Sequence, residues 1–246
     1  MFLILFLLFQ LFYAYDENIA YKSAYLSQLN YCEIKDCNNC IIDFNVTNAG
    51  SQALQGFDNT TNTIFTSFRG SSNKHNWIEN IQVSHINPYK NTSLSVEKGF
   101  YKDYEYIKKQ LFENLDDLVS LYNTRDLLIT GHSLGAAAST LFAFDVAMEN
   151  DYNILYFYNF GSPRVGNLEF CEMFDFMIDG FRVVHNNDIV TSLPPKLFHY
   201  SHIKQGICYN ENNSIYSFCN DESCGTKCSS DDHIHYLNIT MGSAGC

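Results

Sequence analysis

The sequence contains few positively charged residues. Its 246 residues include 15 Lys and Arg against 27 Asp and Glu, which gives a formal net charge of −12. Proteins that bind nucleic acid or anionic lipid usually do so through a basic surface that attracts phosphate groups. The composition therefore argues against such partners, and nucleic acid above all. It favours a neutral substrate, or one presented on a surface of low charge.

Long apolar runs are absent after residue 14. The initial run, MFLILFLLFQLFYA, is too short to span a bilayer and resembles the core of a secretory signal peptide. We therefore predict a signal peptide over residues 1–14 and a secreted protein, either extracellular or in the lumen of the secretory or lysosomal pathway. The sequence is 46% hydrophobic and has no internal repeat, so residues 15–246 are predicted to form a single domain.

Two patterns typical of metal sites are incomplete. Cys37 and Cys40 form a C-x-x-C with no second C-x-x-C to complete a zinc site, so a small structural disulfide is the better interpretation. The late acidic residues lack the spacing of an EF-hand and are typical of a solvated loop: Asp221, Glu222, Asp231 and Asp232. We expect neither a metal ion nor an organic cofactor.

Nine cysteines behind a secretory leader predict disulfide bonds. Cys32 and Cys246 can tie the two ends of the chain together. Because a disulfide lowers the entropy of the unfolded chain, such a bridge is expected to stabilise the folded protein by about 5 kcal/mol. The short Cys37–Cys40 loop is expected to contribute about 2 kcal/mol. Cys171 is the expected free thiol. A loop near the C-terminal end is predicted to be stapled by some of four cysteines: Cys208, Cys219, Cys224 and Cys228. Five N-x-[ST] sequons permit glycosylation, at Asn45, Asn59, Asn91, Asn212 and Asn238.

The most informative pattern is the G-x-S-x-G motif of residues 131–135, with Ser133 at its centre. The apolar run 127–130 before it predicts a buried strand, and residues 136–148 after it predict a helix. A tight turn between a strand and a helix lifts a serine onto a strained elbow and exposes its hydroxyl group as a nucleophile. The N-terminus of the helix then directs backbone N–H groups toward the reaction centre.

Strand and helix patterns alternate over the middle of the chain. This alternation predicts parallel strands joined by crossover helices. We therefore expect an α/β fold of the α/β-hydrolase type, with a mostly parallel central sheet, helices on both faces, and disulfide bonds as staples. The predicted strands are 63–68, 127–130, 154–160, 181–184 and 203–209, and the predicted helices are 16–30, 96–122, 136–148 and 167–177.

A serine nucleophile needs a base and a carboxylate that orients the base. In α/β-hydrolases the three follow the chain order Ser, Asp or Glu, His. Asp188 is the best candidate acid, because it comes directly after a predicted strand and begins a loop. Chain order alone leaves the base open among four histidines: His199, His202, His233 and His235.

Several longer motifs occur in a fixed order along the chain. They are FRGS at 68–71, NWI at 76–78, GHSLGAAA at 131–138, NFGSPRVGN at 159–167, NDIV with LPP at 187–195, and DHIHY at 232–236. With these motifs the sequence resembles the class 3, fungal-type triacylglycerol lipase family over nearly all of the chain after the leader. The resemblance implies an α/β-hydrolase fold and ester hydrolysis without a cofactor.

The resemblance also implies roles for particular residues. Ser133 becomes the nucleophile and Asp188 the acid, and the D-H-x-x-Y pattern selects His233 as the base. Oxyanion donors are implied at Leu134, through the backbone N–H after the nucleophile, and at Ser71. The resemblance supports the Cys32–Cys246 and Cys37–Cys40 bridges and suggests a Cys219–Cys228 bridge. The remaining cysteines, Cys171, Cys208 and Cys224, lie outside the family pattern, and their pairing stays open.

Residues 73–82 are the predicted lid. On a short helix, Trp77, Ile78 and Ile81 fall on one side, which would cover the site in water and turn toward a lipid–water interface. The predicted function is hydrolysis of acylglycerols or other neutral lipid esters through an acyl-enzyme. A feruloyl-type esterase and a phospholipase remain alternatives, although the net charge disfavours anionic head groups. A non-catalytic binding protein is a further alternative, which the complete Ser, Asp and His set argues against.

Overall fold

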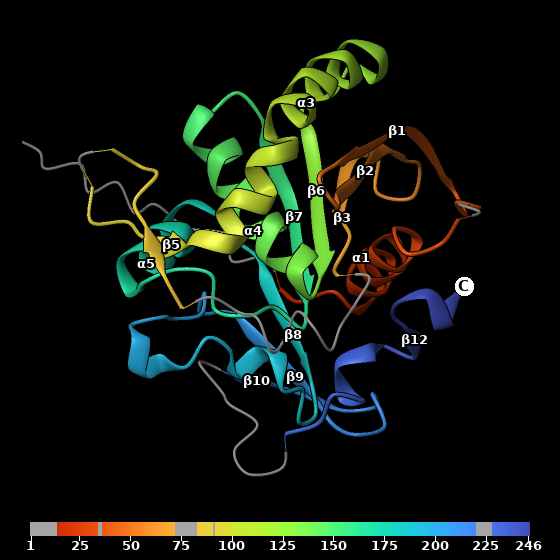
Figure 1. Ribbon diagram of the computed structural model, residues 1–246. Coiled ribbons are helices and arrows are strands. Elements are labelled where there is room, and N and C mark those ends of the chain that lie inside the picture. The colour runs from red at the N-terminus through yellow and green to blue at the C-terminus, as the bar shows by residue number, and fades with distance from the viewer. Residues whose placement is uncertain (1–13, 34–35, 72–82, 91, 220–227) are drawn as a thin grey trace, which may run out of the picture.

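The computed structural model describes residues 14–33, 36–71, 83–90, 92–219 and 228–246 (Figure 1). Nearly all of the predicted signal peptide therefore lies outside the described residues. The same holds for the predicted lid residues Trp77, Ile78 and Ile81.

The described residues form a central eight-stranded sheet with the order β1-β2-β3-β6-β7-β8-β9-β10. Strands β3, β6, β7, β8 and β9 run parallel to one another, whereas β1 and β2 at one edge and β10 at the other are antiparallel to their neighbours. The mostly parallel α/β sheet expected from the alternating patterns is confirmed. The strand bounds are β1 Cys40–Asn48, β2 Ser51–Asp58, β3 Thr63–Phe68, β6 Asp126–His132, β7 Asn153–Phe160, β8 Phe181–His185, β9 Gly206–Tyr209 and β10 Tyr216–Cys219.

Helices cover both faces of this sheet (Figure 1). Strand β6 illustrates the two layers, because successive side chains of a strand point to opposite faces. Leu127 and Ile129 pack in the cluster formed with α3 (Lys98–Tyr122), α4 (Leu134–Glu149) and α5 (Leu168–Met177), whereas Leu128 packs in a separate cluster with α1 (Glu17–Leu29). A strand buried on both faces reads as a continuous apolar run, as the sequence of β6 does.

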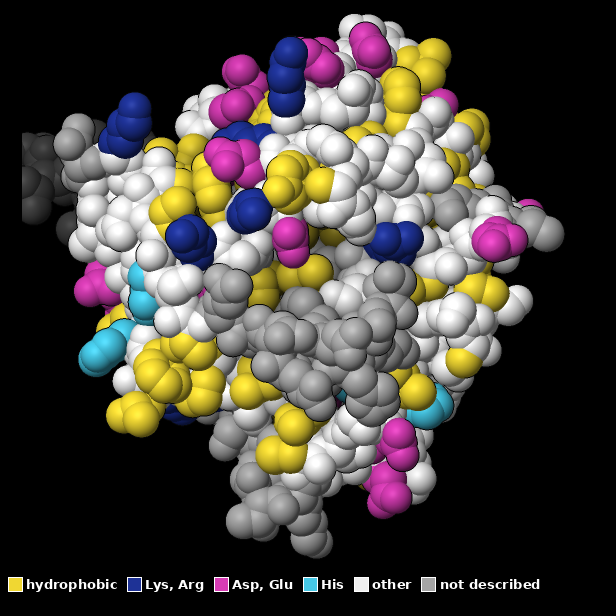
Figure 2. Space-filling model, viewed as in Figure 1, with side chains coloured by type: hydrophobic (Ala, Val, Ile, Leu, Met, Phe, Trp, Pro, Cys, Tyr) yellow, Lys and Arg dark blue, Asp and Glu magenta, His cyan; other side chains and the backbone are white. Residues whose placement is uncertain are grey.

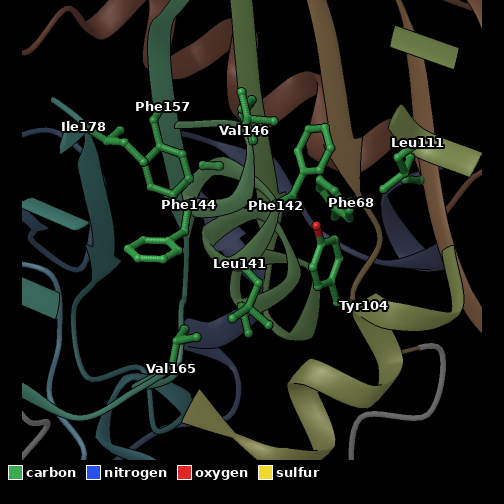
Figure 3. Packing of buried hydrophobic residues seen from close by; sticks show 14 of the residues in the cluster. Phe68, Tyr104, Leu111, Leu141, Phe142, Phe144, Val146, Phe157, Val165 and Ile178 are labelled. Carbon is green, nitrogen blue, oxygen red and sulfur yellow. The ribbon is translucent and has the colours of Figure 1, made fainter. Parts of the chain in front are cut away.

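Aromatic side chains fill the layer between the sheet and α3 and α4 (Figure 3). The rings of Phe68 on β3 and Phe142 on α4 lie 5.4 Å apart between centroids. Tyr104 on α3 is fully buried and donates a hydrogen bond to Asp145 on α4 at 2.8 Å. This packing holds α4, and with it the turn between β6 and α4, rigidly against the sheet.

Helix α3 is the long amphipathic helix that the spacing of its apolar residues predicts. It begins after Glu97, whose carboxylate accepts a hydrogen bond from the Phe100 N–H at 2.7 Å, as an N-cap does. It ends at Asn123, which has a left-handed φ of 51°. Charged side chains gather over α3 on the face shown in Figure 2. Near the end of the helix Leu121 is 65% exposed, whereas Val119 and Tyr122 still pack against the core.

The sequence patterns do not predict β1, β2 or β10. Strand β2 contains polar residues that are buried, such as Gln55, and these break the apolar alternation. The Gln55 side chain donates to Thr66 and to the Leu111 carbonyl and accepts from Asn114. Tertiary hydrogen bonds thus replace apolar burial in this strand.

Short elements complete the structure and carry several site residues. The two-residue strands are β4 His85–Ile86, β5 Val96–Glu97, β11 His235–Tyr236 and β12 Ile239–Thr240, and the 3₁₀ helices are η1 Val190–Ser192, η2 Lys196–Phe198, η3 Asp232–Ile234 and η4 Ser243–Gly245. Among the helices described, none has the length and apolar character needed to cross a membrane.

Three disulfide bonds are present in the described residues. Two are the expected Cys32–Cys246 and Cys37–Cys40 bridges. The expected Cys219–Cys228 bridge is wrong, because Cys219 pairs with Cys208. These two cysteines lie on the antiparallel strands β10 and β9, whose pairing brings their Cα atoms to 5.9 Å, within disulfide range.

The other two described cysteines differ in state. Cys228 is also disulfide-bonded. Cys171 is a buried thiol, as expected, and its Sγ lies 3.3 Å from the Ser201 carbonyl oxygen.

Candidate active site

Ser133 occupies a sharp turn between β6 and α4. Its φ of 61° and ψ of −126° are unusual for a residue with a side chain, which is the strain expected of a nucleophile elbow. The flanking glycines permit the close packing of this turn. A Cβ atom on Gly131 would lie 2.2 Å from the Gly135 carbonyl oxygen, and one on Gly135 would lie 2.3 Å from the Phe68 carbonyl oxygen. The G-x-S-x-G spacing is therefore a steric requirement of this structure.

The structure brings together the three predicted catalytic residues. His233 in η3 accepts a hydrogen bond from the Ser133 hydroxyl at Nε2, over 2.8 Å. Its Nδ1–H donates to Asp188 Oδ2, also over 2.8 Å. All three side chains are almost fully buried. The resulting line from hydroxyl to imidazole to carboxylate is the arrangement that activates a serine for nucleophilic attack.

Asp188 lies in the loop that follows β8, and further donors hold its carboxylate in place. Its Oδ1 accepts from the Val190 N–H at 2.8 Å, and its Oδ2 accepts from the Tyr236 hydroxyl as well as from His233. Burial, together with the nearby charge of Asp188, raises the pKa of Tyr236 well above its usual range, so this hydroxyl remains a neutral donor. We did not single out Tyr236 from the sequence, although it is the final residue of the D-H-x-x-Y motif.

The two predicted oxyanion donors belong to the elbow itself and to the segment that packs against it. Leu134 is the first residue of α4, where the backbone N–H groups have no intrahelical acceptor. Ser71 directly follows Gly70, in the segment after β3 ends at Phe68. This segment runs against the elbow, because a Cβ atom on Gly70 would lie 3.0 Å from the Ser133 Cβ.

The other candidate histidines have contacts or positions that do not involve the nucleophile. His202 is buried and donates to the Thr191 carbonyl at 2.7 Å, and its pKa is lowered by burial and by nearby arginines. His235 is exposed, with Nδ1 3.0 Å from the Asp231 carbonyl oxygen. His199 is the exposed residue that ends η2. Of the four histidines that chain order left open, His233 alone forms a hydrogen bond to Ser133 among the contacts of the described residues.

No group of three or more His, Cys, Asp or Glu side chains suited to a metal ion occurs within the part of the chain that is described. Two of the late acidic residues, Asp221 and Glu222, lie outside that part.

A strained serine on a strand–helix elbow, in line with a histidine and a buried carboxylate, defines this fold and site as those of an α/β-hydrolase. A family model described as Lipase (class 3) matches residues 65–198, which is more than half of the chain. The protein therefore belongs to the class 3 lipase family, as the motifs predicted.

Individual relatives agree with this assignment. The chain is 32% identical over 146 residues to a secreted mono- and diacylglycerol lipase A of Penicillium cyclopium, a match that covers 59% of this chain and 48% of that protein. The chain thus spans about half the length of that curated relative. It superimposes on the triacylglyceride lipase of Rhizomucor miehei with a TM-score of 0.82, 27% identity, and coverage of 93% and 97% of the two chains. A second structure, of a triacylglycerol lipase whose catalytic centre is a serine protease triad, gives a TM-score of 0.81 with 28% identity over 93% and 97% of the two chains.

Proposed function

We propose that this protein hydrolyses carboxylic ester bonds of acylglycerols. The observation that carries the proposal is the continuous hydrogen-bonded line from Ser133 through His233 to Asp188, with 2.8 Å at each step. The names of the relatives support acylglycerols as the substrate class. The net charge of −12 also suits a neutral ester better than an anionic one.

The geometry suits acyl transfer in two halves. His233 takes the hydroxyl proton as Ser133 Oγ attacks the ester carbonyl, and Asp188 stabilises the imidazolium that forms. The N–H groups of Leu134 and Ser71 stabilise the developing oxyanion, and loss of one such donor costs about 3–4 kcal/mol of barrier. His233 then gives its proton to the leaving alcohol. A water molecule repeats the sequence on the acyl-enzyme and releases the fatty acid.

We further propose that residues 73–82 act as a lid and that the protein is secreted. The amphipathic pattern around Trp77 and Ile81 supports the lid. The apolar run over residues 1–14 supports secretion, as does the name of the Penicillium relative, a secreted lipase.

Ser133→Ala tests the proposed activity. Hydrolysis of an emulsified triglyceride should fall by about a millionfold, because only binding and the oxyanion donors remain. A fluorophosphonate probe should label the native protein and not the variant. Ser139→Ala is the matched control, since Ser139 is a buried serine on α4 whose hydroxyl donates to the Ala136 carbonyl. Equal labelling of native protein and Ser133→Ala, or no labelling of either, would refute the proposal and favour a non-catalytic binding protein.

A further inference from the structure

A second chain of hydrogen bonds joins three segments of the candidate active site. The Gly70 N–H donates to the Tyr31 hydroxyl at 3.0 Å, and this hydroxyl lies 2.8 Å from Nδ1 of His132. Nε2 of His132 lies 2.8 Å from the backbone carbonyl oxygen of His233. The chain therefore connects the segment before Ser71, the nucleophile elbow, and the backbone of the base.

The direction of each hydrogen bond follows from the chemistry of the groups. A carbonyl oxygen only accepts, so Nε2 of His132 carries the hydrogen in its bond to His233. In a neutral imidazole the other nitrogen is then an acceptor. The Tyr31 hydroxyl accepts from Gly70 and donates its own proton to Nδ1 of His132. Each group thus has the partner that the tautomer requires, and the His132 tautomer is fixed.

Tyr31 reaches the site from outside the strand–helix elbow. It follows α1, its N–H donates to the Gln28 carbonyl at 3.0 Å, and the adjacent Cys32 is bonded to Cys246. Burial raises the pKa of its hydroxyl well above the usual range. The hydroxyl therefore stays protonated and available as a donor throughout the neutral pH range.

His132 also lies against the base itself. Its ring is fully buried, and its centroid is 4.6 Å from that of His233. Through Nε2–H it holds the backbone from which the His233 imidazole extends toward Ser133. Because the base must lie within hydrogen-bond reach of the hydroxyl, a shift of this backbone would change the 2.8 Å contact directly.

We propose that Tyr31 and His132 are positioning residues that align the base and the oxyanion segment with the nucleophile. This inference rests on the proposed ester hydrolysis. The proposal requires no contact of either side chain with the substrate. They act through the His233 carbonyl at one end and the Gly70 N–H at the other. Their removal should therefore slow the chemical step and leave substrate binding almost unchanged.

Tyr31→Phe tests the proposal, with kinetics on a soluble p-nitrophenyl ester. We expect kcat per active site to fall by about tenfold to a hundredfold while KM changes by less than about twofold, because small displacements of catalytic groups have effects of that size. Active sites are counted by prolonged fluorophosphonate labelling, so that unfolded protein does not enter kcat. The control is Tyr25→Phe on the preceding helix α1. Its hydroxyl likewise accepts a hydrogen bond from a backbone N–H, that of Asn38, and it donates to the Asp36 carbonyl.

A double-mutant cycle with His132→Asn tests the connection between the two residues. The asparagine oxygen can still accept from Tyr31, but the bond to the His233 carbonyl is lost. If both residues act through one chain, the combined loss in kcat will be at least about threefold smaller than the product of the single losses. If the two single losses in kcat multiply fully in the double variant, the two residues act independently and the proposed hydrogen-bonded connection is refuted.

The outcomes separate this inference from the proposed function. If the native protein hydrolyses no ester, the proposed function fails. If the native protein is active and Tyr31→Phe matches Tyr25→Phe in kcat per labelled site, the inference alone fails, even if Tyr31→Phe lowers thermal stability. His132→Asn is not needed for that decision, so a folding defect in that variant leaves the test intact.

Discussion

At the scale of single residues, backbone conformation decides whether the three proposed catalytic side chains can meet. Gly161 directly follows β7 with a φ of 58°, and the position that a Cβ atom would take faces the pair formed by Asp188 and His233. A Cβ atom there would lie 2.8 Å from Asp188 Oδ2 and 2.9 Å from the His233 ring. The glycine of the N-F-G-S-P motif is therefore required both by the turn and by the space that the triad occupies.

We expect Gly161→Ala to lower kcat by at least about a hundredfold, because the new methyl group displaces His233 or Asp188 from hydrogen-bonding position. The matched control is Gly50→Ala. Gly50 also has a positive φ, of 92°, but an added Cβ would have no neighbour within 4 Å. Both variants place an alanine at a positive φ, and only the first crowds the site. Ester hydrolysis by folded protein checks the prediction, and comparable activity of the two variants would contradict it.

At the scale of elements, the end of α5 carries an unfavourable charge. Asp175 lies in the last turn of this helix, near the negative end of its dipole, where an anion is destabilising. The carboxylate accepts only the N–H of Lys204, at 3.1 Å to each oxygen, among the hydrogen bonds found in the described residues. Burial raises the pKa of Asp175 to about 6.

The raised pKa makes Asp175 a pH-dependent cost to stability. Between about pH 4, near the unfolded value, and about pH 6 the native state binds more protons than the unfolded chain. The contribution of Asp175 to the free energy of unfolding therefore rises as pH falls through this window. We expect Asp175→Asn to stabilise the protein by about 1 kcal/mol at pH 7.5, a value reduced for partial exposure, and to have little effect at pH 4.

Urea unfolding at the two pH values measures this difference. The control is Asp151→Asn, which removes the same charge from an exposed position and should change stability by less than about 0.5 kcal/mol at either pH. An equal effect of Asp175→Asn at pH 4 and pH 7.5 would show that the ionised carboxylate is not the cause.

At the scale of the whole molecule, the proposed function depends on how the protein meets its substrate. Three large apolar side chains of the proposed lid, Trp77, Ile78 and Ile81, would cost up to about 5–9 kcal/mol if they were all exposed to water. A lipid surface removes most of this cost. The same protein should therefore respond differently to dissolved and to aggregated ester.

We expect the rate on a short-chain triglyceride to rise sharply when its concentration passes the solubility limit. Replacing Trp77 and Ile81 with serine should remove the rise and keep activity on a soluble ester, because the catalytic residues are unchanged. Initial rates measured across the limit provide the test. A smooth hyperbola through the limit would refute the lid and leave the esterase proposal standing.

Local patterns predicted much of this protein. The apolar run of β6, the G-x-S-x-G turn and the helix after it were sufficient to place Ser133 on an elbow, since each depends on neighbours within a few residues. Asp188 was selected because it follows a strand. Chain order left four histidines as candidates, and only the resemblance to a family selected His233.

The sequence by itself determined the parallel sheet and the position of the nucleophile, because hydrophobic periodicity and turn sterics act over short stretches of chain. Only the tertiary structure decided that Cys219 bonds to Cys208, that polar β2 joins the sheet, and that Tyr31 reaches the elbow through His132. The contacts of His233 with Asp188 and Ser133 span 45 and 100 residues. Such contacts depend on how whole layers pack, and no local sequence pattern encodes the distance between residues that lie on different layers.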